Sequence, residues 1–282
     1  MGELSQGLRN FTQSLAECQH ELRKDYRHLI AELNCYIPRG LRLRVETLSG
    51  TVKEKKMSVN QRISNVEIRQ EHTARDNLAR LEVEGVLGVN LMAAPGAGKT
   101  SLIQRTVEVL SPSLRIGIVE ATPSVGGPEP LYESEVPWVQ VTTGAAPHLD
   151  AAMLSQALRR IPLTAVDILL VENVGNLIRE GPCELGLQAN VIIASVPEGD
   201  DKPYRYSEIY RDADAVILNK TDLLGSSAFD IEFFRRGVEL IKPGVPVFPL
   251  SCRTGADLYR WIDWLALTRK YALATMTATS GR

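Results

Sequence analysis

Short apolar runs alternate with stretches of helical spacing from Gly85 onward. Most runs are continuously apolar, which is typical of strands that are covered on both faces of a parallel sheet. The pattern predicts an α/β fold, with a mostly parallel sheet and helices on both of its faces. The expected strands are Val86 to Met92, Arg115 to Val119, Trp138 to Thr142, Asp167 to Val171, Asn190 to Val196, Ala213 to Leu218 and Val245 to Leu250.

The segments between these runs have the apolar spacing of amphipathic helices. We expect the last segment, Ala274 to Arg282, to fray, because it is small and polar. Five helices are expected: one after Lys99, one around Leu149 to Arg160, one before Asp212, one around Phe229 to Leu240 and one from Asp257 to Ala272.

The first part of the chain follows a different pattern. Phe11 to Leu33 has helical spacing with many charges, Arg39 to Lys56 is basic without a period, and Met57 to Leu81 predicts a second amphipathic helix. The resulting division is a helical N-terminal extension (1–56), a lead-in helix (57–84) and an α/β domain (85–282).

The residues before Met57 suggest a hypothesis about translation. Lys53 to Lys56 must be encoded by purine-rich codons, and one spelling contains AAGGAG, a bacterial ribosome-binding sequence. Natural translation would then start at Met57. The alternative is a genuine N-terminal helix followed by a basic linker.

Composition narrows the class of protein. The chain has 282 residues, of which 44% are hydrophobic and 23% charged, as in soluble globular proteins. A formal net charge of −2 gives no general attraction to nucleic acid or to an anionic membrane. None of the scattered cysteines forms a C-x-x-C pair, so neither a disulfide framework nor a zinc ribbon is indicated, and we expect a cytoplasmic protein. The cysteines are Cys18, Cys35, Cys183 and Cys252.

A glycine-rich turn follows the first expected strand and opens a helix. Such a turn directs backbone N–H groups and the positive end of the helix toward a phosphate. Lys99 can reach the β- and γ-phosphates, and the Thr100 hydroxyl can ligate Mg²⁺. The strict motif has glycine where Ala93 stands, so the second half carries the match. The candidate phosphate-binding residues are Gly96, Ala97, Gly98, Lys99, Thr100 and Ser101.

A second motif selects the base. Asn219, Lys220 and Asp222 follow the strand that ends at Leu218. A carboxylate at Asp222 can accept hydrogen bonds from the N1–H and N2–H₂ groups of guanine, whereas adenine would leave it unpaired. A loop with Ser251 and Cys252 follows the last strand, and a backbone N–H there could meet the guanine carbonyl oxygen; taken alone, this loop is better interpreted as a simple strand-to-helix turn. The chain is therefore expected to bind GTP and GDP.

These residues resemble a known family. Glu172 to Leu177 (E-N-V-G-N-L), Glu198 to Pro203 (E-G-D-D-K-P) and Asn219 to Leu224 (N-K-T-D-L-L) are similar to the hydrogenase nickel-incorporation GTPases (HypB). The resemblance covers about Asn77 to Leu265. The urease accessory GTPase (UreG) is a related protein, but the first two segments favour the hydrogenase branch.

The resemblance implies a P-loop GTPase that forms a GTP-dependent homodimer and carries nickel at the interface. It also implies two partners, a hydrogenase precursor and a nickel-binding accessory protein. Glu172, with Lys99 and Thr100, would form the catalytic and Mg²⁺-binding set. Gly175 would let the backbone approach the γ-phosphate. The alternative for Glu172 is a strand-end carboxylate in a salt bridge.

The family's metal ligands are altered in this chain. Pro147 and His148 stand where the family has Cys-His, and Arg179 occupies the position of the second cysteine. His148 and Cys183 could form a rearranged site for Ni²⁺ or Zn²⁺ across a dimer, because such sites use thiolate and imidazole ligands. We favour the alternative, in which His148 is a surface or switch-adjacent histidine and Cys183 a loop thiol.

A further departure concerns Mg²⁺. Thr122 stands where the family commonly has an aspartate, and a hydroxyl is a weaker ligand than a carboxylate for this cation. Glu120 is a possible substitute. The sequence thus favours a GTPase that acts as a maturation factor for a nickel enzyme. Two alternatives stay open: a GTP-gated regulatory or scaffold module without metal binding, and a maturation factor for another metalloenzyme.

Overall fold

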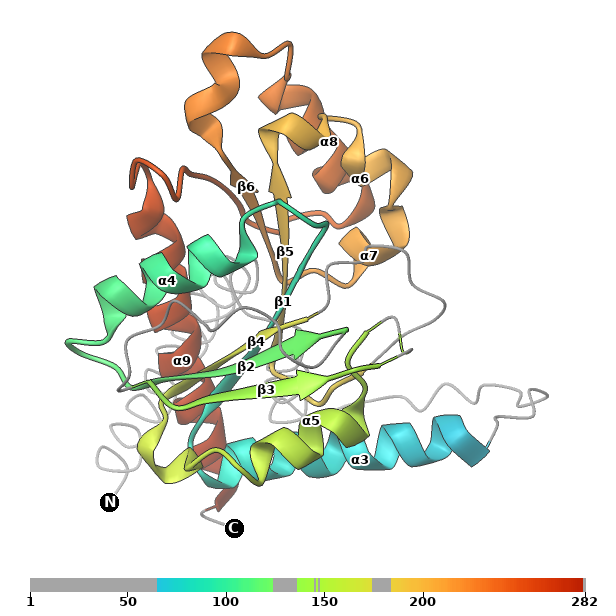
Figure 1. The fold of residues 1–282 in the computed structure, drawn as a ribbon, viewed down its shortest axis with the longest axis vertical. Coiled ribbons are helices and arrows are strands. Elements are labelled where there is room, and N and C mark those ends of the chain that lie inside the picture. Colours follow the sequence, from blue (N-terminus) through green and yellow to red (C-terminus); the bar gives the residue numbers. More distant parts are fainter. Residues whose placement is uncertain (1–64, 124–135, 145, 147, 174–183, 281–282) are drawn as a thin grey trace, which may run out of the picture.

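A parallel seven-stranded sheet forms the centre of the molecule, with strand order β3-β2-β4-β1-β5-β6-β7 (Figure 1). This computed structural model describes residues 65–123, 136–144, 146, 148–173 and 184–280. Every strand expected from the sequence is present, with ends shifted by a few residues. The strands are β1 (Leu87–Ala93), β2 (Ile116–Thr122), β3 (Trp138–Thr142), β4 (Ile168–Glu172), β5 (Ala189–Ser195), β6 (Ala215–Asn219) and β7 (Val247–Pro249).

Helices cover both faces of this sheet, as the apolar pattern predicts. Short 3₁₀ turns lie at Leu163–Ala165 (η1), Val196–Glu198 (η2) and Thr221–Ser226 (η3). The α-helices are α3 (Asn65–Val83), α4 (Lys99–Leu110), α5 (Ala151–Leu158), α6 (Lys202–Arg205), α7 (Ser207–Arg211), α8 (Ile231–Ile241) and α9 (Leu258–Ser280).

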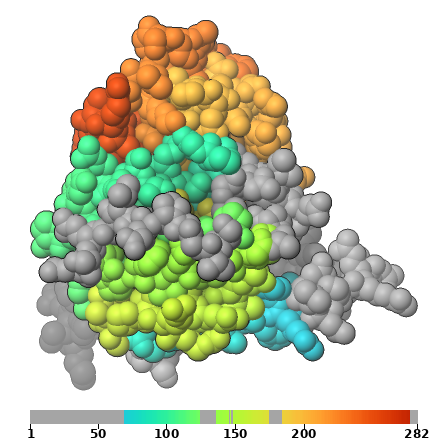
Figure 2. Space-filling model, viewed as in Figure 1, coloured from blue at the N-terminus to red at the C-terminus, as the bar shows by residue number. Residues whose placement is uncertain are grey.

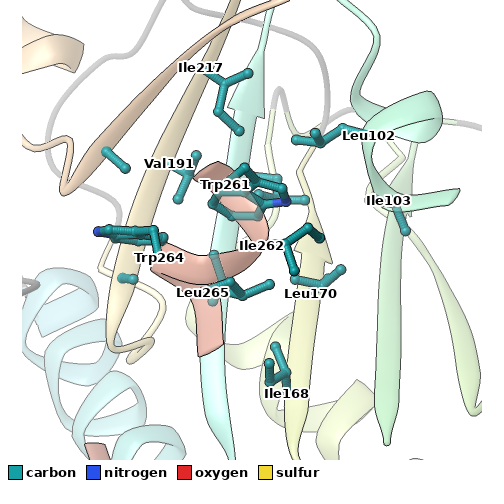
Figure 3. Close-up of a cluster of buried hydrophobic side chains, with 14 of the residues drawn as sticks. Leu102, Ile103, Ile168, Leu170, Val191, Ile217, Trp261, Ile262, Trp264 and Leu265 are labelled. Atoms are coloured by element: carbon teal, nitrogen blue, oxygen red, sulfur yellow. The ribbon is translucent and has the colours of Figure 1, made fainter. Parts of the chain in front are cut away.

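The apolar core on one face lies under α4 and α9 (Figure 3). Leu102 of α4 and Trp261 of α9 are fully buried against strand residues such as Val191 and Ile217. The Trp261 indole N–H donates to the Thr106 hydroxyl oxygen at 2.9 Å, so the one polar atom of this ring is satisfied inside the core. The nucleotide-binding candidate helix α4 is thereby fixed to α9.

The opposite face is divided between two groups of helices. Near β2 and β4, residues of α3 and α5 form one apolar cluster, and near β5 and β6, α7 and α8 form another. Asn77 of α3 donates to the carbonyl oxygens of Ala151 and Leu185 at 2.9 and 3.0 Å. Helix α3 is therefore packed on the domain at Asn77; residues 57–64 of the expected lead-in helix and the extension 1–56 lie outside the described residues.

The expected fraying of the C-terminal segment is wrong as far as Ser280, because α9 continues to that residue. Ala272 and Met276 are buried in the core cluster, and the Thr275 hydroxyl donates to the Ala272 carbonyl oxygen at 2.7 Å. The small polar composition hid this burial, since Met276 is a single apolar residue among small and polar neighbours. Among the described residues, no helix is both long and apolar enough to span a membrane.

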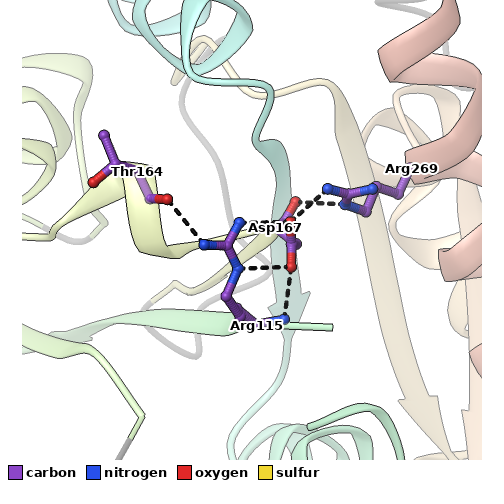
Figure 4. A network of polar contacts seen from close by, with 4 residues as sticks. All are labelled: Arg115, Thr164, Asp167 and Arg269. Carbon is purple, nitrogen blue, oxygen red and sulfur yellow. Dashed lines mark hydrogen bonds and ion pairs between the residues drawn. The ribbon is translucent and has the colours of Figure 1, made fainter. Parts of the chain in front are cut away.

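An ion network at the amino ends of β2 and β4 fastens α9 to the sheet (Figure 4). Asp167 accepts hydrogen bonds from the Arg115 backbone N–H and guanidinium at 2.9 to 3.1 Å, and from Arg269 of α9 at 2.5 Å. The Arg115 guanidinium also donates to the Thr164 carbonyl oxygen at 3.0 Å. The hydrogen bonds from Arg115 are the main cause that lowers the pKa of Asp167 to about 2.

Asp167→Asn should lower the free energy of unfolding at pH 7 by roughly 1–3 kcal/mol, because two guanidinium groups lose their carboxylate. A carboxyl pKa that is depressed in the folded state stabilises the protein above the unfolded pKa of about 4. This stabilisation is lost as the pH falls toward 2, so the difference between wild type and variant should narrow there. Urea unfolding at several pH values measures it.

Asp257→Asn is the matched control, because Asp257 pairs with Arg260 at 4.0 Å and both side chains are half exposed. This control should change the unfolding free energy by less than about 0.5 kcal/mol. Equal losses in the two variants would contradict the assigned role of Asp167.

Candidate functional site

The candidate residues gather at the carboxyl ends of the central strands. The connection after β1 leads to β2 on one side of the sheet, whereas the connection after β5 leads to β6 on the other side. In open α/β sheets, ligands usually bind at the carboxyl ends of the strands where the chain direction reverses in this way. On the face shown in Figure 2, the teal surface that includes the start of α4 lies directly below the orange surface that follows β6. A cavity of about 590 Å³ is lined by Gly98, Ser101, Gln104, Arg105, Glu108, Asn219, Lys220, Asp222, Leu223, Cys252 and Arg253.

The glycine-rich turn has the backbone geometry that its sequence predicts. Gly96 and Gly98 have φ values of 77° and 102°, in the left-handed region that favours glycine. A Cβ at Gly98 would lie 2.3 Å from the Asn219 side-chain nitrogen, so any other residue there would collide with it. Helix α4 starts at Lys99, and Gly98 caps it without a side-chain bond, which leaves its first N–H groups available to an anion.

Lys99 carries a half-buried ammonium beside this turn. Its Nζ lies 3.5 Å from the Ala93 carbonyl oxygen. Burial lowers the pKa of Lys99, while the carboxylates of Glu172 and Glu198 act in the opposite direction. A negatively charged ligand at the turn would oppose the effect of burial, because it favours the charged form of the amine.

An oxygen cluster lies next to Lys99 at the ends of β2 and β4. The Thr100 hydroxyl donates to Glu172 Oε1 at 2.9 Å, and Glu172 is buried. Glu120 pairs with Glu172 in the register of the two strands, and burial together with the Glu172 charge raises the pKa of Glu120. Carboxylate and hydroxyl oxygens are the ligand types that Mg²⁺ takes.

Asn219 joins the two loops that the sequence motifs define. Its side-chain nitrogen donates to the Ala97 carbonyl oxygen of the glycine-rich turn at 3.0 Å. Its side-chain oxygen accepts from the backbone N–H groups of Lys220 and Cys252 at 2.7 and 3.1 Å. The Cys252 N–H, one candidate for a base contact, is thus bonded within the protein.

Lys220 adds a second link between the same loops. It adopts a left-handed backbone conformation with φ 62°, and its Nζ donates to the Gly96 carbonyl oxygen at 2.6 Å. Positive φ is uncommon for a residue with a side chain. This backbone conformation therefore places the Lys220 side chain across the turn.

Asp222 is held by the loop that follows β7. Its Oδ1 accepts from the Ser251 hydroxyl at 2.5 Å, and its Oδ2 lies 2.8 Å from the Arg253 guanidinium. The Ser251 bond, and then the Arg253 charge, lower the pKa of Asp222, so the group is an ionised acceptor at neutral pH. Both partners of Asp222 come from a segment about thirty residues further along the chain, which only the folded sheet brings here.

Cys252, in the loop that follows β7, is buried. Burial raises the pKa of its thiol to about 11, so the thiol is neutral at physiological pH. Its carbonyl oxygen accepts from Arg105 Nε of α4 at 2.9 Å. Cys252 thus contributes mainly backbone contacts, which tie its loop to both α4 and Asn219.

The segment that carries His148 is anchored to the same strand end. Asn173, which follows Glu172, accepts from the Leu149 N–H at 3.0 Å. Asp150 caps α5 and accepts from Gln70 of α3 at 3.2 Å. Within the described residues, no group of three or more His, Cys, Asp or Glu side chains is arranged to hold a metal. The other residues expected to bear on the metal or the γ-phosphate are outside them: Pro147, Gly175, Arg179 and Cys183.

Several residues that the sequence motifs do not assign also belong to this region. Arg105 and Arg253 line the cavity. Glu198 accepts from the Ser195 hydroxyl at 2.8 Å and pairs with Lys202 at 3.4 Å. In the sequence, Arg253 lies in the loop that begins at Ser251, and Glu198 begins the Glu198 to Pro203 segment. These positions could have drawn attention to both residues, but the sequence does not show what their side chains contact.

Comparison with known proteins identifies the family. The CobW/HypB/UreG nucleotide-binding domain matches residues 88–249. The hydrogenase maturation factor HypB of Azotobacter vinelandii is 36% identical over 202 residues, which cover 71% of this chain and 67% of that protein. The chain thus spans about two thirds of the length of this relative.

Two solved structures have the same fold. The hydrogenase maturation factor HypB of Archaeoglobus fulgidus is 33% identical with a TM-score of 0.66, covering 72% of this chain and 99% of that one. HypB of Helicobacter pylori, solved in complex with nickel, is 28% identical with a TM-score of 0.65, covering 72% and 95%. The chain belongs to the CobW/HypB/UreG family of nucleotide-binding domains.

Proposed function

We propose that this chain is a Mg²⁺-dependent GTPase that serves as a maturation factor, with nickel insertion into a hydrogenase precursor as its role. The observation that carries the nucleotide part is the Asn219 side chain, which bonds to Ala97 on one side and to Cys252 on the other. This amide connects the glycine-rich turn, the proposed phosphate site, to the loop after β7, which belongs to the proposed base site; residues of both line one cavity. The hydrogenase part is supported by the similarity to HypB proteins.

Guanine selection is assigned to Asp222. The carboxylate has about four lone-pair positions, so it can accept from Ser251 and still receive the two donors of the guanine edge. Adenine presents no matching pair of donors and would leave this carboxylate unpaired. Asn219 and Lys220 hold the loop in place through their bonds to the glycine-rich turn.

The phosphate and metal roles fall to the neighbouring residues. The backbone from Gly96 to Ser101 would surround the phosphates, and Lys99 would place its ammonium on the β- and γ-oxygens. Thr100 and Glu172 would hold Mg²⁺, which would neutralise charge on the transferred phosphoryl group. Hydrolysis would be slow and switch-like, because positioning and electrostatics carry it.

The protein should bind GTP and GDP in preference to ATP and ADP. Asp222→Asn should weaken GDP binding by more than about tenfold and favour the xanthine nucleotide, whose carbonyl accepts from an amide. Calorimetric titration with GDP, ADP and XDP measures the preference. Lys99→Ala is the comparison variant. It should weaken the binding of nucleoside triphosphates and abolish hydrolysis, but leave the order of base preference unchanged. Equal affinity for GDP and ADP in the wild-type protein would refute the base site.

A GTP-dependent homodimer is the proposed active form. The charged turn of Asp200, Asp201 and Lys202 follows β5 at the ligand-binding end of the sheet. Asp200 also accepts from the Asp230 N–H at 2.8 Å, so this turn is fixed to the start of α8. A partner that approaches this end would cover both the turn and the nucleotide.

Sedimentation velocity should show a larger species with GTP and Mg²⁺ than with GDP. Lys99→Ala, which keeps the surface but loses the triphosphate contact, should stay at the GDP mass. One unchanged mass with GTP, GDP and no nucleotide would remove the dimer from the proposal.

This chain lacks residues that the family pattern uses as metal ligands. Pro147 has no ligating side-chain atom, and Arg179 carries a charge of the same sign as the metal. These two positions favour the second candidate function, a GTP-gated regulatory or scaffold module whose metal is carried by a nickel-binding accessory partner. A maturation factor for a different metalloenzyme would share this nucleotide site.

Titration of the reduced protein with Ni²⁺ and Zn²⁺ should give weak binding or none, in both the GDP and GTP states. Two variants, His148→Ala and Cys183→Ala, distinguish the candidate functions. Tight stoichiometric binding that either variant abolishes would establish a rearranged metal site and the metallochaperone role. Tight binding that both variants retain would point to ligands elsewhere in the chain.

A further inference from the structure

Arg253 occupies the carboxylate that the proposed base site needs. Its guanidinium lies 2.8 Å from Asp222 Oδ2, and both residues line the cavity of about 590 Å³. The other carboxylate oxygen accepts from Ser251 at 2.5 Å. In this arrangement, both oxygens of Asp222 already have a donor from the loop that follows β7.

The two side chains of this ion pair differ in their freedom to move. The Asp222 side chain is 12% exposed and is held by Ser251, whereas the Arg253 side chain is 75% exposed. Solvent-exposed ion pairs contribute little to stability, because water and salt screen them and ordering a long side chain loses entropy. Arg253 is therefore the partner that can leave Asp222.

We propose that the Arg253 guanidinium pairs with Asp222 in the free protein, is displaced when guanine arrives and thereby sets the affinity of the guanine site. This inference rests on the proposed function, because it assumes that Asp222 receives the base. The guanidinium N–H groups and the guanine N1–H and N2–H₂ groups are donors of the same kind, so they compete for the same carboxylate.

Displacement has two measurable consequences. The Asp222 Oδ2 position that Arg253 fills is one that the guanine edge needs in this proposal, so guanine binding breaks the ion pair and the affinity for guanine nucleotides is lower than the bare Asp222 site would give. The pair is also screened by salt, with a Debye length near 8 Å at physiological ionic strength and about 3 Å at 1 M, so the competition weakens as salt is added. Arg253 thereby makes guanine affinity depend on ionic strength through the base site, independently of the phosphates.

The test is calorimetric titration of the magnesium-loaded protein with GDP, at low and at high salt. Arg253→Ala should bind GDP about two- to fivefold more tightly than wild type at low salt, the range expected for release from an exposed ion pair. This ratio should approach one at about 1 M salt. Arg253→Lys, which keeps the positive charge, should stay closer to wild type than the alanine variant does.

A double-mutant cycle tests the pairing itself. An amide at position 222 has no charge to attract a guanidinium, so Arg253→Ala should have no effect on XDP binding when it is combined with Asp222→Asn. Arg260→Ala is the matched control, because Arg260 is an exposed arginine that pairs with Asp257 outside the cavity. It should leave GDP affinity unchanged at both salt concentrations.

Unchanged or weaker GDP binding by Arg253→Ala would overturn the inference; weaker binding would mean that Arg253 contacts the nucleotide directly. An equal gain in the Asp222→Asn background would also overturn it, since the effect would then not pass through the carboxylate. If wild type binds no guanine nucleotide, the proposed function fails as well, a result distinct from a GDP-binding protein that is indifferent to Arg253.

Discussion

One buried amide, the side chain of Asn219, connects the parts of the site. It bonds to the Ala97 carbonyl oxygen and the Cys252 N–H, and its nitrogen would lie only 2.3 Å from a Cβ at position 98. The glycine at 98 and the asparagine at 219 therefore depend on each other, although about 120 residues separate them. With a buried polar group of this kind, loss of any one partner leaves the others unsatisfied, which makes the arrangement specific.

The core below the site gives this arrangement a rigid base. Trp261 of α9 bonds to Thr106 of α4, and Arg105, the residue before Thr106, bonds to the Cys252 carbonyl oxygen. Helix α9 is in turn fastened to the far end of the sheet by the ion pair of Arg269 with Asp167. The long C-terminal helix thus links the amino ends of the strands to the nucleotide end.

Charge is concentrated where the strands end. Glu120 and Glu172 lie side by side, the half-buried Lys99 is under the influence of the Glu172 and Glu198 carboxylates, and Asp222 is paired with Arg253. Burial first, and then repulsion by the neighbouring Glu172 carboxylate, raise the pKa of Glu120. A bound cation would relieve that repulsion, and local conflicts of this kind are typical of functional sites.

The sequence alone determined the sheet, because continuous apolar runs permit few alternatives to buried parallel strands. It also located the glycine-rich turn and the Asn219 to Asp222 motif. The turn could be found from local residue types, because glycine favours the left-handed conformation seen before the start of α4. Only the tertiary structure decided which distant groups meet these motifs: the Asn219 link to Ala97, the Arg253 pair with Asp222, and the burial of Met276. Such contacts depend on strand order and helix packing, which bring together residues that no local pattern relates.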